Sequence, residues 1–290
     1  MNQLSNILLV VNPISGNTDK GDLIQKIESR VAQKNIHLKK YHTTGKGDVE
    51  KITELLNSFE AHRVLVAGGD GTIKMLAETL RDQNIPLGIL PTGSANGLAH
   101  NLGISEILDE AIETALGDRL QEIDAICIDN DLCLHIADLG LNAELIKNYE
   151  NGQIRGKIGY ALQAVPTLIN SKMPFSFEIT TDEGTIHQEG ILLGIANASH
   201  YGTGARVNPD GKINDGKFEV LIFKKFDVID IAQTLQPENE PDADFMEFVA
   251  TTRVKIRCKQ AIPFQIDGEY YGEVDQVEAY VLPNHLQIAV

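Results

Sequence analysis

The stretch at residues 64–73 places the tightest limits on how this chain can fold. A short apolar run at 64–67 leads into Gly68-Gly69-Asp70-Gly71-Thr72. From Ile73 to Leu80, apolar residues then recur at i, i+3, i+4 and i+7, which is the spacing of a helix face. The pattern predicts a strand, a tight turn and a helix. Such a turn directs backbone N–H groups and the positive end of a helix toward a bound anion.

Asp70 is the unexpected member of this turn, because a carboxylate beside a bound phosphate is repulsive. A cation that also touches the phosphates would give Asp70 a role. The turn is therefore interpreted as a nucleotide-phosphate loop with a metal-facing acid. A second interpretation stays open, in which the glycines close an ordinary strand–helix unit and Asp70 caps the helix.

The first part of the chain alternates between strand and helix periods. Strand-like runs occur at 7–11, 36–40, 64–67, 86–90 and 122–128, and helical patterns lie between them at 23–31, 49–59, 73–80 and 107–116. This alternation is typical of βαβ units around a parallel sheet. We expect residues 1–125 to form an α/β nucleotide-binding domain with three layers.

Beyond residue 126 the rhythm changes to short strands with little helix. One helical pattern remains at 157–168, and a polar loop is expected at 236–242. The strand-like runs lie at 175–180, 191–197, 218–223, 253–257, 263–266, 277–281 and 286–290. Many short strands separated by turn signals favour an antiparallel β-sandwich, which we expect over residues 126–282.

Composition limits the function classes that need to be considered. The 290 residues carry 41 acidic and 25 basic side chains, a formal net charge of −16. Such a charge argues against broad nucleic-acid binding and against tight attachment to an anionic membrane. No apolar run approaches the length of a transmembrane segment, and the N-terminus lacks signal-peptide features. We therefore expect a soluble, cytoplasmic protein.

The cysteines suggest no special chemistry. Cys127, Cys133 and Cys258 show no C-x-x-C spacing. Cys127 and Cys133 could face each other across a turn at residues 129–131, but reduced thiols are the expected state of a cytoplasmic protein.

Small polar loops follow the other predicted parallel strands. They are Asn12-Pro13-Ile14-Ser15-Gly16-Asn17, Thr43-Thr44-Gly45-Lys46-Gly47-Asp48 and Pro91-Thr92-Gly93-Ser94-Ala95-Asn96-Gly97. The carboxyl ends of parallel strands share one edge of the sheet, where ligands usually bind. Plain turns could explain each loop alone. Together with residues 68–72 they predict a nucleotide site, although no Walker A pattern is present.

Two features of the second half could carry chemistry. In the loop at 210–218, the Asp215 carboxylate with the carbonyl oxygens of Lys212 and Lys217 could hold a hard cation, or the loop could be a simple hairpin turn. Asp267-Gly268-Glu269 places two carboxylates on a turn. An acid there could serve as a general base for a hydroxyl substrate, or the turn could be merely solvated.

The order of these motifs resembles that of the diacylglycerol kinase and sphingosine kinase family. The residues that carry the resemblance are 12–16, 68–72, 91–96, 215–218 and 267–269. The resemblance covers nearly the whole chain. It implies an α/β domain followed by a β-sandwich, with ATP in the cleft between them. It also implies that the C-terminal strand, residues 283–290, can return to the first domain.

The resemblance further implies roles for individual residues. Lys212, Asp215 and Lys217 match a Mg²⁺ position, Asp267 and Glu269 match the turn that provides the proton acceptor, and Asp70 would anchor catalytic Mg²⁺. The residues expected to bind ATP are Asn12, Pro13, Ile14, Ser15, Gly16, Thr43, Gly68, Gly69, Asp70, Gly71, Thr72, Ile73, Lys74, Ser94 and Asn96.

One position departs from the family pattern. Gly97 stands where bacterial diacylglycerol kinases usually carry an acid. Sphingoid-base and ceramide kinases, in contrast, also tend to have a small residue at this position. We expect an ATP- and Mg²⁺-dependent kinase of a diacylglycerol-like or sphingoid- or ceramide-like lipid, which it meets peripherally and transiently at the inner membrane face. A kinase similar to NAD kinases, a nucleotide-binding regulator with little catalysis and a homodimer all stay open.

Overall fold

A computed structural model of the protein describes residues 4–16, 19–81, 83–151, 173–197, 200–201, 205–206, 208, 211–225 and 244–290. The predicted helix at 157–168 and the polar loop at 236–242 lie outside the described residues. The chain divides into two compact units, Met1–Ile123 with Asn284–Val290, and Asp124–Pro283. Each unit is described by itself.

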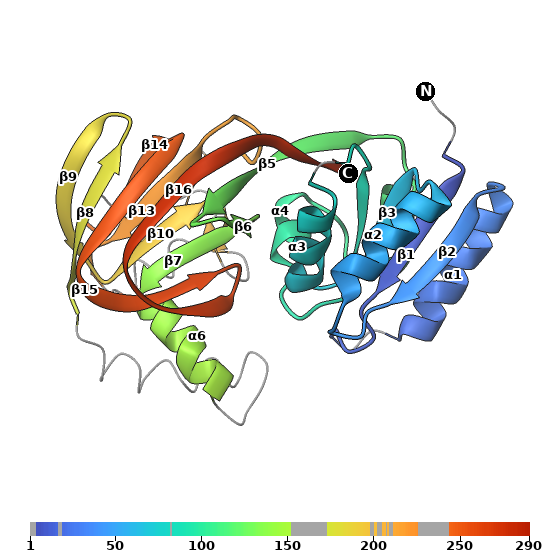
Figure 1. Cartoon of the computed structure of the whole chain (residues 1–290), viewed down its shortest axis with the longest axis horizontal. Helices are drawn as coiled ribbons and strands as arrows, with labels where there is room; N and C mark the ends of the chain where they lie inside the picture. Colours follow the sequence, from blue (N-terminus) through green and yellow to red (C-terminus); the bar gives the residue numbers. More distant parts are fainter. Residues whose placement is uncertain are drawn as a thin grey trace. The chain divides into compact units, whose positions relative to one another are not determined.

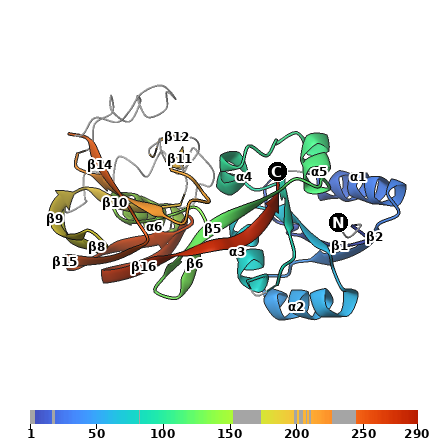
Figure 2. The same cartoon turned by 90° about the horizontal axis from the view of Figure 1, so that it is seen from above.

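The first unit is a parallel sheet covered by helices on both faces (Figures 1 and 2). Its strands run in the order β16, β4, β3, β1, β2, and every neighbouring pair is parallel. The elements are β1 (Asn6–Val11), α1 (Lys20–Gln33), β2 (His37–His42), α2 (Asp48–Phe59), β3 (Arg63–Gly68), α3 (Asp70–Thr79), β4 (Leu87–Pro91), α4 (Gly97–Asn101) and α5 (Leu108–Ala115).

Apolar periodicity explains why these segments form three layers. All residues of β3 are buried, as are five of the six residues of β1, which is expected of strands covered on both faces. On one face Leu23, Ile27 and Val31 of α1 pack with α5 against β1 and β3 in a single core cluster. In Figure 2, α2 and α3 cover the opposite face. The last residues of β16 complete the sheet, since Ile288 pairs with Leu87 of β4.

The second unit is built almost entirely from antiparallel strands. Its elements include the end of β5 (Leu120–Ile128), β6 (Asp131–Cys133), β7 (Ile136–Gly140), α6 (Leu141–Asn151), β8 (Phe175–Thr181), β9 (Gly184–Gly190), β10 (Leu192–Ala196), β11 (His200–Tyr201), β12 (Ala205–Arg206), β13 (Phe218–Phe223), β14 (Met246–Thr251), β15 (Arg253–Ile266) and most of β16 (Glu269–Ala289). The predicted fold class, a parallel α/β domain followed by an antiparallel β-sandwich, is confirmed.

Strand lengths are the main difference from the sequence expectation. The runs predicted at 253–257 and 263–266 belong to one strand, β15, whose register shifts between Arg257 and Ile262. The runs at 277–281 and 286–290 likewise lie largely within β16. In β15 the alternation breaks at residues 259–261, three consecutive exposed positions that lie where the pairing with β16 shifts register. The sequence pattern also missed α4, α6, β6, β7, β9, β11, β12 and β14.

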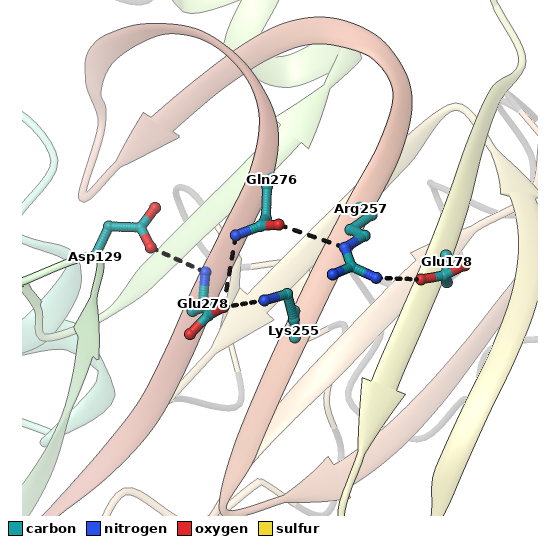
Figure 3. Close-up of polar contacts among 6 residues, drawn as sticks. All are labelled: Asp129, Glu178, Lys255, Arg257, Gln276 and Glu278. Atoms are coloured by element: carbon teal, nitrogen blue, oxygen red, sulfur yellow. Dashed lines mark hydrogen bonds and ion pairs between the residues drawn. The ribbon is translucent and has the colours of Figure 1, made fainter.

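The exposed side of the β8–β15–β16 sheet carries a row of charged and polar side chains (Figure 3). Arg257 pairs with Glu178 of β8 at 3.1 Å, and Lys255 pairs with Glu278 of β16. Gln276 accepts a hydrogen bond from Arg257 at 3.4 Å. Val254 and Ile256 alternate with these residues and point into the sandwich core, where the neighbouring Phe177 of β8 also packs.

The cysteine expectation is corrected in one detail. Cys127 lies opposite Leu132 across the β5–β6 hairpin, and Cys133 lies opposite Ile126, so the two cysteines do not face each other. Both are buried, Cys258 is partly buried, and none of the three forms a disulfide.

Candidate functional site

The loops predicted to bind nucleotide leave the carboxyl ends of β1, β2, β3 and β4. Because these four strands are parallel neighbours, their loops emerge at one edge of the sheet. The structure therefore brings residues 12–16, 43–47, 68–72 and 92–96 to the same edge. Their proposed contact with ATP is still a prediction.

The loop after β1 is tied to the turn after β3. The Asn12 amide donates to the Thr72 hydroxyl at 3.0 Å, and its backbone N–H bonds to the Ala67 carbonyl at 2.9 Å. The Asn12 side-chain oxygen accepts the N–H of Ile14, which closes a local turn. Ile14 itself is 89% exposed at the tip of this loop. These bonds fix the loop through two elements that lie far apart in the sequence.

Glycines allow the loops to approach more closely than side chains would permit. A Cβ atom at Gly93 would lie 2.4 Å from the Gly69 Cα, so the two backbones are in direct contact. A Cβ at Gly16 would lie 2.3 Å from the Thr92 carbonyl oxygen, and Gly16 has a positive φ of 53°. The loops after β1, β3 and β4 form one packed body, which we call the joined loops (residues 12–16, 68–72 and 92–96).

The Asp70 carboxylate makes backbone contacts that the sequence did not predict. Its carboxylate accepts the backbone N–H of Gly97 at 3.0 Å and that of Leu98 at 3.1 Å. It thus caps α4, the helix after the fourth strand, whereas the cap residue of its own helix α3 is Gly69, which makes no side-chain bond. The expectation that Asp70 caps its own helix is wrong. Gly97, the residue that departs from the family pattern, supplies one of the amides that hold Asp70.

Lys20 is a site residue that the sequence analysis missed. Its ammonium donates to the Ser15 carbonyl at 2.8 Å and to the Thr92 carbonyl at 3.4 Å, which links two of the joined loops. Burial lowers the pKa of Lys20. Its position in the first helical residue after a glycine-containing loop was the available signal. Lys74, predicted to contact ATP, is buried in α3.

The loop that contains Thr43 is closed around a buried carboxylate. Thr43 donates its N–H to the Val11 carbonyl at 2.9 Å. The Asp48 carboxylate accepts the N–H groups of Thr44 and Gly45 and the hydroxyl of Tyr41. Burial favours the neutral acid, but these hydrogen bonds outweigh it and hold the pKa of Asp48 below its ordinary value. Asp48 therefore shapes the loop.

The two acids of the Asp267-Gly268-Glu269 turn lie in different surroundings. The Asp267 carboxylate accepts three backbone N–H groups, from Leu134 at 3.0 Å, His135 at 2.9 Å and Ile136 at 3.2 Å. Glu269 is exposed, and its side chain makes no hydrogen bond or ion pair within the part of the chain that the structure describes. Asp267 thus clamps the turn, while Glu269 is available for chemistry.

The predicted metal loop is exposed and is anchored by a buried acid. Asp215 lies on the surface with Lys212 and Lys217, and it accepts the N–H of Lys217 at 3.1 Å. Asp124, only 1% exposed, accepts the N–H of Gly216 at 2.7 Å and donates its own N–H to Ile213. Asp124 was missed, although a single acid inside the apolar run of β5 was a visible signal.

A Mg²⁺ ion is compatible with the donors of this loop. Asp215 offers a carboxylate, and Lys212 and Lys217 offer carbonyl oxygens, the hard ligands that Mg²⁺ prefers. Across the described residues, no group of three or more His, Cys, Asp or Glu side chains is arranged to hold a metal. A site here would thus depend on backbone oxygens and water.

Comparison with known protein families accounts for both units. The diacylglycerol kinase catalytic domain matches residues 6–128, and the YegS C-terminal NAD kinase beta sandwich-like domain matches residues 136–290. The chain belongs to the YegS-like lipid kinase family.

Similar proteins extend over most of the chain. A probable lipid kinase YegS-like from Chromohalobacter salexigens is 28% identical and spans 85% of this chain and 82% of its own length. Lipid kinase YegS from Escherichia coli K12 is 28% identical over 78% of each chain. The crystal structure of a putative diacylglycerol kinase from Bacillus anthracis has the same fold, with a TM-score of 0.81, 22% identity and coverage of 100% of this YegS-like chain and 98% of its own.

The described helices of this YegS-like protein include none that is both long and apolar enough to span a membrane.

Proposed function

We propose that the protein is an ATP- and Mg²⁺-dependent lipid kinase that phosphorylates a hydroxyl of a diacylglycerol-like or a sphingoid- or ceramide-like lipid. The observation that carries the proposal is the packing of the joined loops. Three glycine-containing loops meet in direct backbone contact at the edge of a parallel sheet where nucleotides usually bind. Membership of the YegS-like lipid kinase family supports a lipid as the acceptor.

The proposed roles are divided between the two units. In the first unit, N–H groups of the joined loops would bind the phosphates of ATP. In the second unit, Glu269 would take the proton of the lipid hydroxyl, because it is exposed and has no competing partner among the described residues. Asp267 would hold the turn that presents Glu269. Phosphoryl transfer depends mainly on alignment and charge neutralisation, so positioning of this kind is the main task of the protein.

Oxygen atoms of the protein would coordinate Mg²⁺. Lys212, Asp215 and Lys217 would hold one Mg²⁺, and Asp70 would contribute near the phosphates while it also caps α4. Bound Mg²⁺ neutralises negative charge on the phosphates. Gly97 adds no carboxylate beside Asp70, so fewer acidic ligands surround the nucleotide than in bacterial diacylglycerol kinases.

A transfer assay tests this function. The purified full-length chain is incubated with [γ-³²P]ATP and either Mg²⁺ or EDTA, with diacylglycerol, sphingosine or ceramide in mixed micelles, or with NAD. We expect Mg²⁺-dependent label in one organic-extractable product. Label in NADP would instead indicate a kinase of the NAD kinase type. Tight ATP binding with no labelled product would indicate a nucleotide-binding regulator, and either result overturns the proposal.

The proposed substrate also sets where the protein works. We propose a cytoplasmic enzyme that binds the inner membrane face transiently while it takes up its lipid. Homodimer formation is tested by the mass of the protein in solution, measured by light scattering.

A further inference from the structure

A buried glutamine lies directly behind the acidic turn. Gln265, near the end of β15, is 1% exposed. Its side-chain oxygen accepts the N–H of Gly268 at 2.7 Å, and its amide nitrogen donates to the carboxylate of Asp138. Gln265 therefore uses both ends of its amide, one on the turn and one on the neighbouring strand.

Asp138 is the fixed point at the other end of this contact. It is fully buried in β7, directly opposite Gln265 in the antiparallel register. The same carboxylate oxygen that binds Gln265 also accepts the Asn142 amide at 2.7 Å from the first turn of α6. A buried carboxylate is costly to keep unless hydrogen bonds compensate for its lost hydration. Asp138 thus orients the amides of Gln265 and Asn142 toward itself.

The turn is held from two sides. On one side, the Asp267 carboxylate binds the N–H groups at 134–136, and the Asp267 N–H returns a bond to the Ile136 carbonyl at 2.8 Å. On the other side, Gln265 holds Gly268. Asp267 and Gly268, with positive φ of 51° and 87°, are the two central residues of the tight β15–β16 turn, which pairs Ile266 with Glu269.

We propose that Gln265 and Asp138 are positioning residues for Glu269. They act through the Gly268 N–H, which fixes the backbone from which the Glu269 side chain projects. The inference rests on the proposed function, in which Glu269 is the proton acceptor. Proton transfer requires the acceptor within hydrogen-bond reach of the hydroxyl, and a misplacement of about 1 Å can lower a rate by ~100-fold.

An exchange of donor and acceptor tests the proposal. Gln265→Glu keeps an oxygen that can accept the Gly268 N–H, but it removes the N–H donor to Asp138. The carboxylates at positions 265 and 138 then repel each other. Adding Asp138→Asn restores a donor opposite position 265. We expect kcat to fall by about 10- to 100-fold in Gln265→Glu and to recover most of that loss in the double variant, while KM for ATP stays unchanged.

The matched control is Gln276→Glu on the exposed side of the same hairpin. Gln276 also bonds to side chains of neighbouring residues, but it lies far along β16 from the turn and contacts Arg257 (Figure 3). We expect wild-type kcat in this variant. If Gln276→Glu lowers kcat as much as Gln265→Glu does, or if the double variant shows no recovery, the proposal is overturned.

Amide exchange provides a readout that does not depend on activity. Hydrogen–deuterium exchange of a peptide covering 266–271 should accelerate in Gln265→Glu and return toward wild type in the double variant. Unchanged exchange in Gln265→Glu would overturn the positioning role. A wild-type protein that labels no lipid would overturn the proposed function alone, since exchange still reports on the turn. If Gln265→Glu does not fold, Gln265→Met, which lacks both polar ends, is measured in the same way.

Discussion

Asp267 and Glu269 are only two positions apart in the sequence, but their surroundings in the structure are different. The Asp267 carboxylate is occupied by three backbone N–H groups, whereas Glu269 is exposed. The sequence left open which of the two would accept the proton. The contacts favour Glu269, because a carboxylate that already accepts several hydrogen bonds is held in place and has less capacity to take a substrate proton.

Glu269→Gln should lower kcat by ~10²- to 10⁴-fold, the usual contribution of a general base. ATP affinity, measured by calorimetry, should be unchanged because the proposed role of Glu269 is to accept the proton of the lipid hydroxyl and not to bind the nucleotide. Glu183→Gln, at another exposed turn of the second unit, is the control. Turnover of Glu269→Gln at the wild-type level would refute the assignment of Glu269 as base.

The Tyr41–Asp48 pair should make stability depend on pH at both extremes. The pKa of Asp48 is lowered in the fold, so its contribution exists above the ordinary pKa of an aspartate and disappears as the pH falls through the folded value. Burial and then the Asp48 contact raise the pKa of Tyr41 to about 12. The contribution of Tyr41 is present below its ordinary pKa of 10.0 and is lost as the pH rises toward 12.

Urea midpoints measured across pH test both signs. Asp48→Asn should reduce the loss of stability below about pH 4, and Tyr41→Phe should reduce the loss above about pH 10. Asp48→Asn should change the alkaline end of the profile less than the acid end, and Tyr41→Phe should change the acid end less than the alkaline end. Profiles that stay parallel to wild type at both ends would show that the pair does not couple to folding.

The C-terminal end of α5 depends on one buried cation. The Arg63 guanidinium donates to the Ala115 carbonyl at 3.0 Å and to the Gly117 carbonyl at 2.6 Å, at the end of a helix whose last carbonyls lack intrahelical partners. Burial lowers the pKa of Arg63, and the nearby charge of Asp118 opposes that effect. A strand residue therefore completes the hydrogen bonding of a helix.

Arg63→Met should lower the free energy of unfolding by about 2 kcal/mol, since hydrogen bonds from a charged group contribute ~1.5–3 kcal/mol each and relief of burial offsets part of the loss. Urea denaturation measures the change. In the control, Arg30→Met, the lost ion pairs with Asp109 and Glu113 are half exposed and should contribute less than ~1 kcal/mol. Equal losses in the two variants would argue against the capping role of Arg63.

The joined loops should not tolerate a side chain where two glycines meet. Gly93→Ala would place a Cβ 2.4 Å from the Gly69 Cα, so one loop must move. We expect ATP affinity to fall at least ~10-fold, with a loss of stability of about 1–3 kcal/mol from overpacking. Gly194→Ala, whose Cβ would have its nearest neighbour at 3.5 Å, is the control for ATP binding. Unchanged ATP affinity in Gly93→Ala would show that the joined loops do not form the nucleotide site.

The charge of the whole molecule should control how it meets a membrane. With a formal net charge of −16, the protein is repelled by anionic lipid. Salt shortens the range of this repulsion, from ~30 Å at 0.01 M to ~8 Å at 0.15 M. Initial rates on vesicles that contain phosphatidylglycerol should therefore rise with NaCl over this range, whereas rates on neutral vesicles should change little. A steep fall with salt on the anionic vesicles would contradict this expectation and point to a local basic surface.

The sequence determined the parts of the molecule that local periodicity encodes. Alternating strand and helix patterns fixed a parallel sheet, and parallel connectivity then required the loops after β1 to β4 to share one edge. The candidate nucleotide-binding loops could therefore be named from the sequence. Their common location follows from the order and direction of the strands and requires no knowledge of long-range side-chain contacts. The antiparallel second unit was predicted from its short runs and turns, although the runs proved to be pieces of longer strands.

Only the tertiary structure decided which groups those residues bind. Asp70 caps a helix that begins at Gly97, Asp267 clamps residues 134–136, and Gln265 joins Gly268 to Asp138. Asp267 and residues 134–136, like Gln265 and Asp138, are more than a hundred positions apart in the sequence. No local periodicity connects residues at such a separation. A hydrogen bond depends on where the fold brings its donor and acceptor. The sequence therefore identified the acids, and the fold assigned them to holding backbone or to facing solvent.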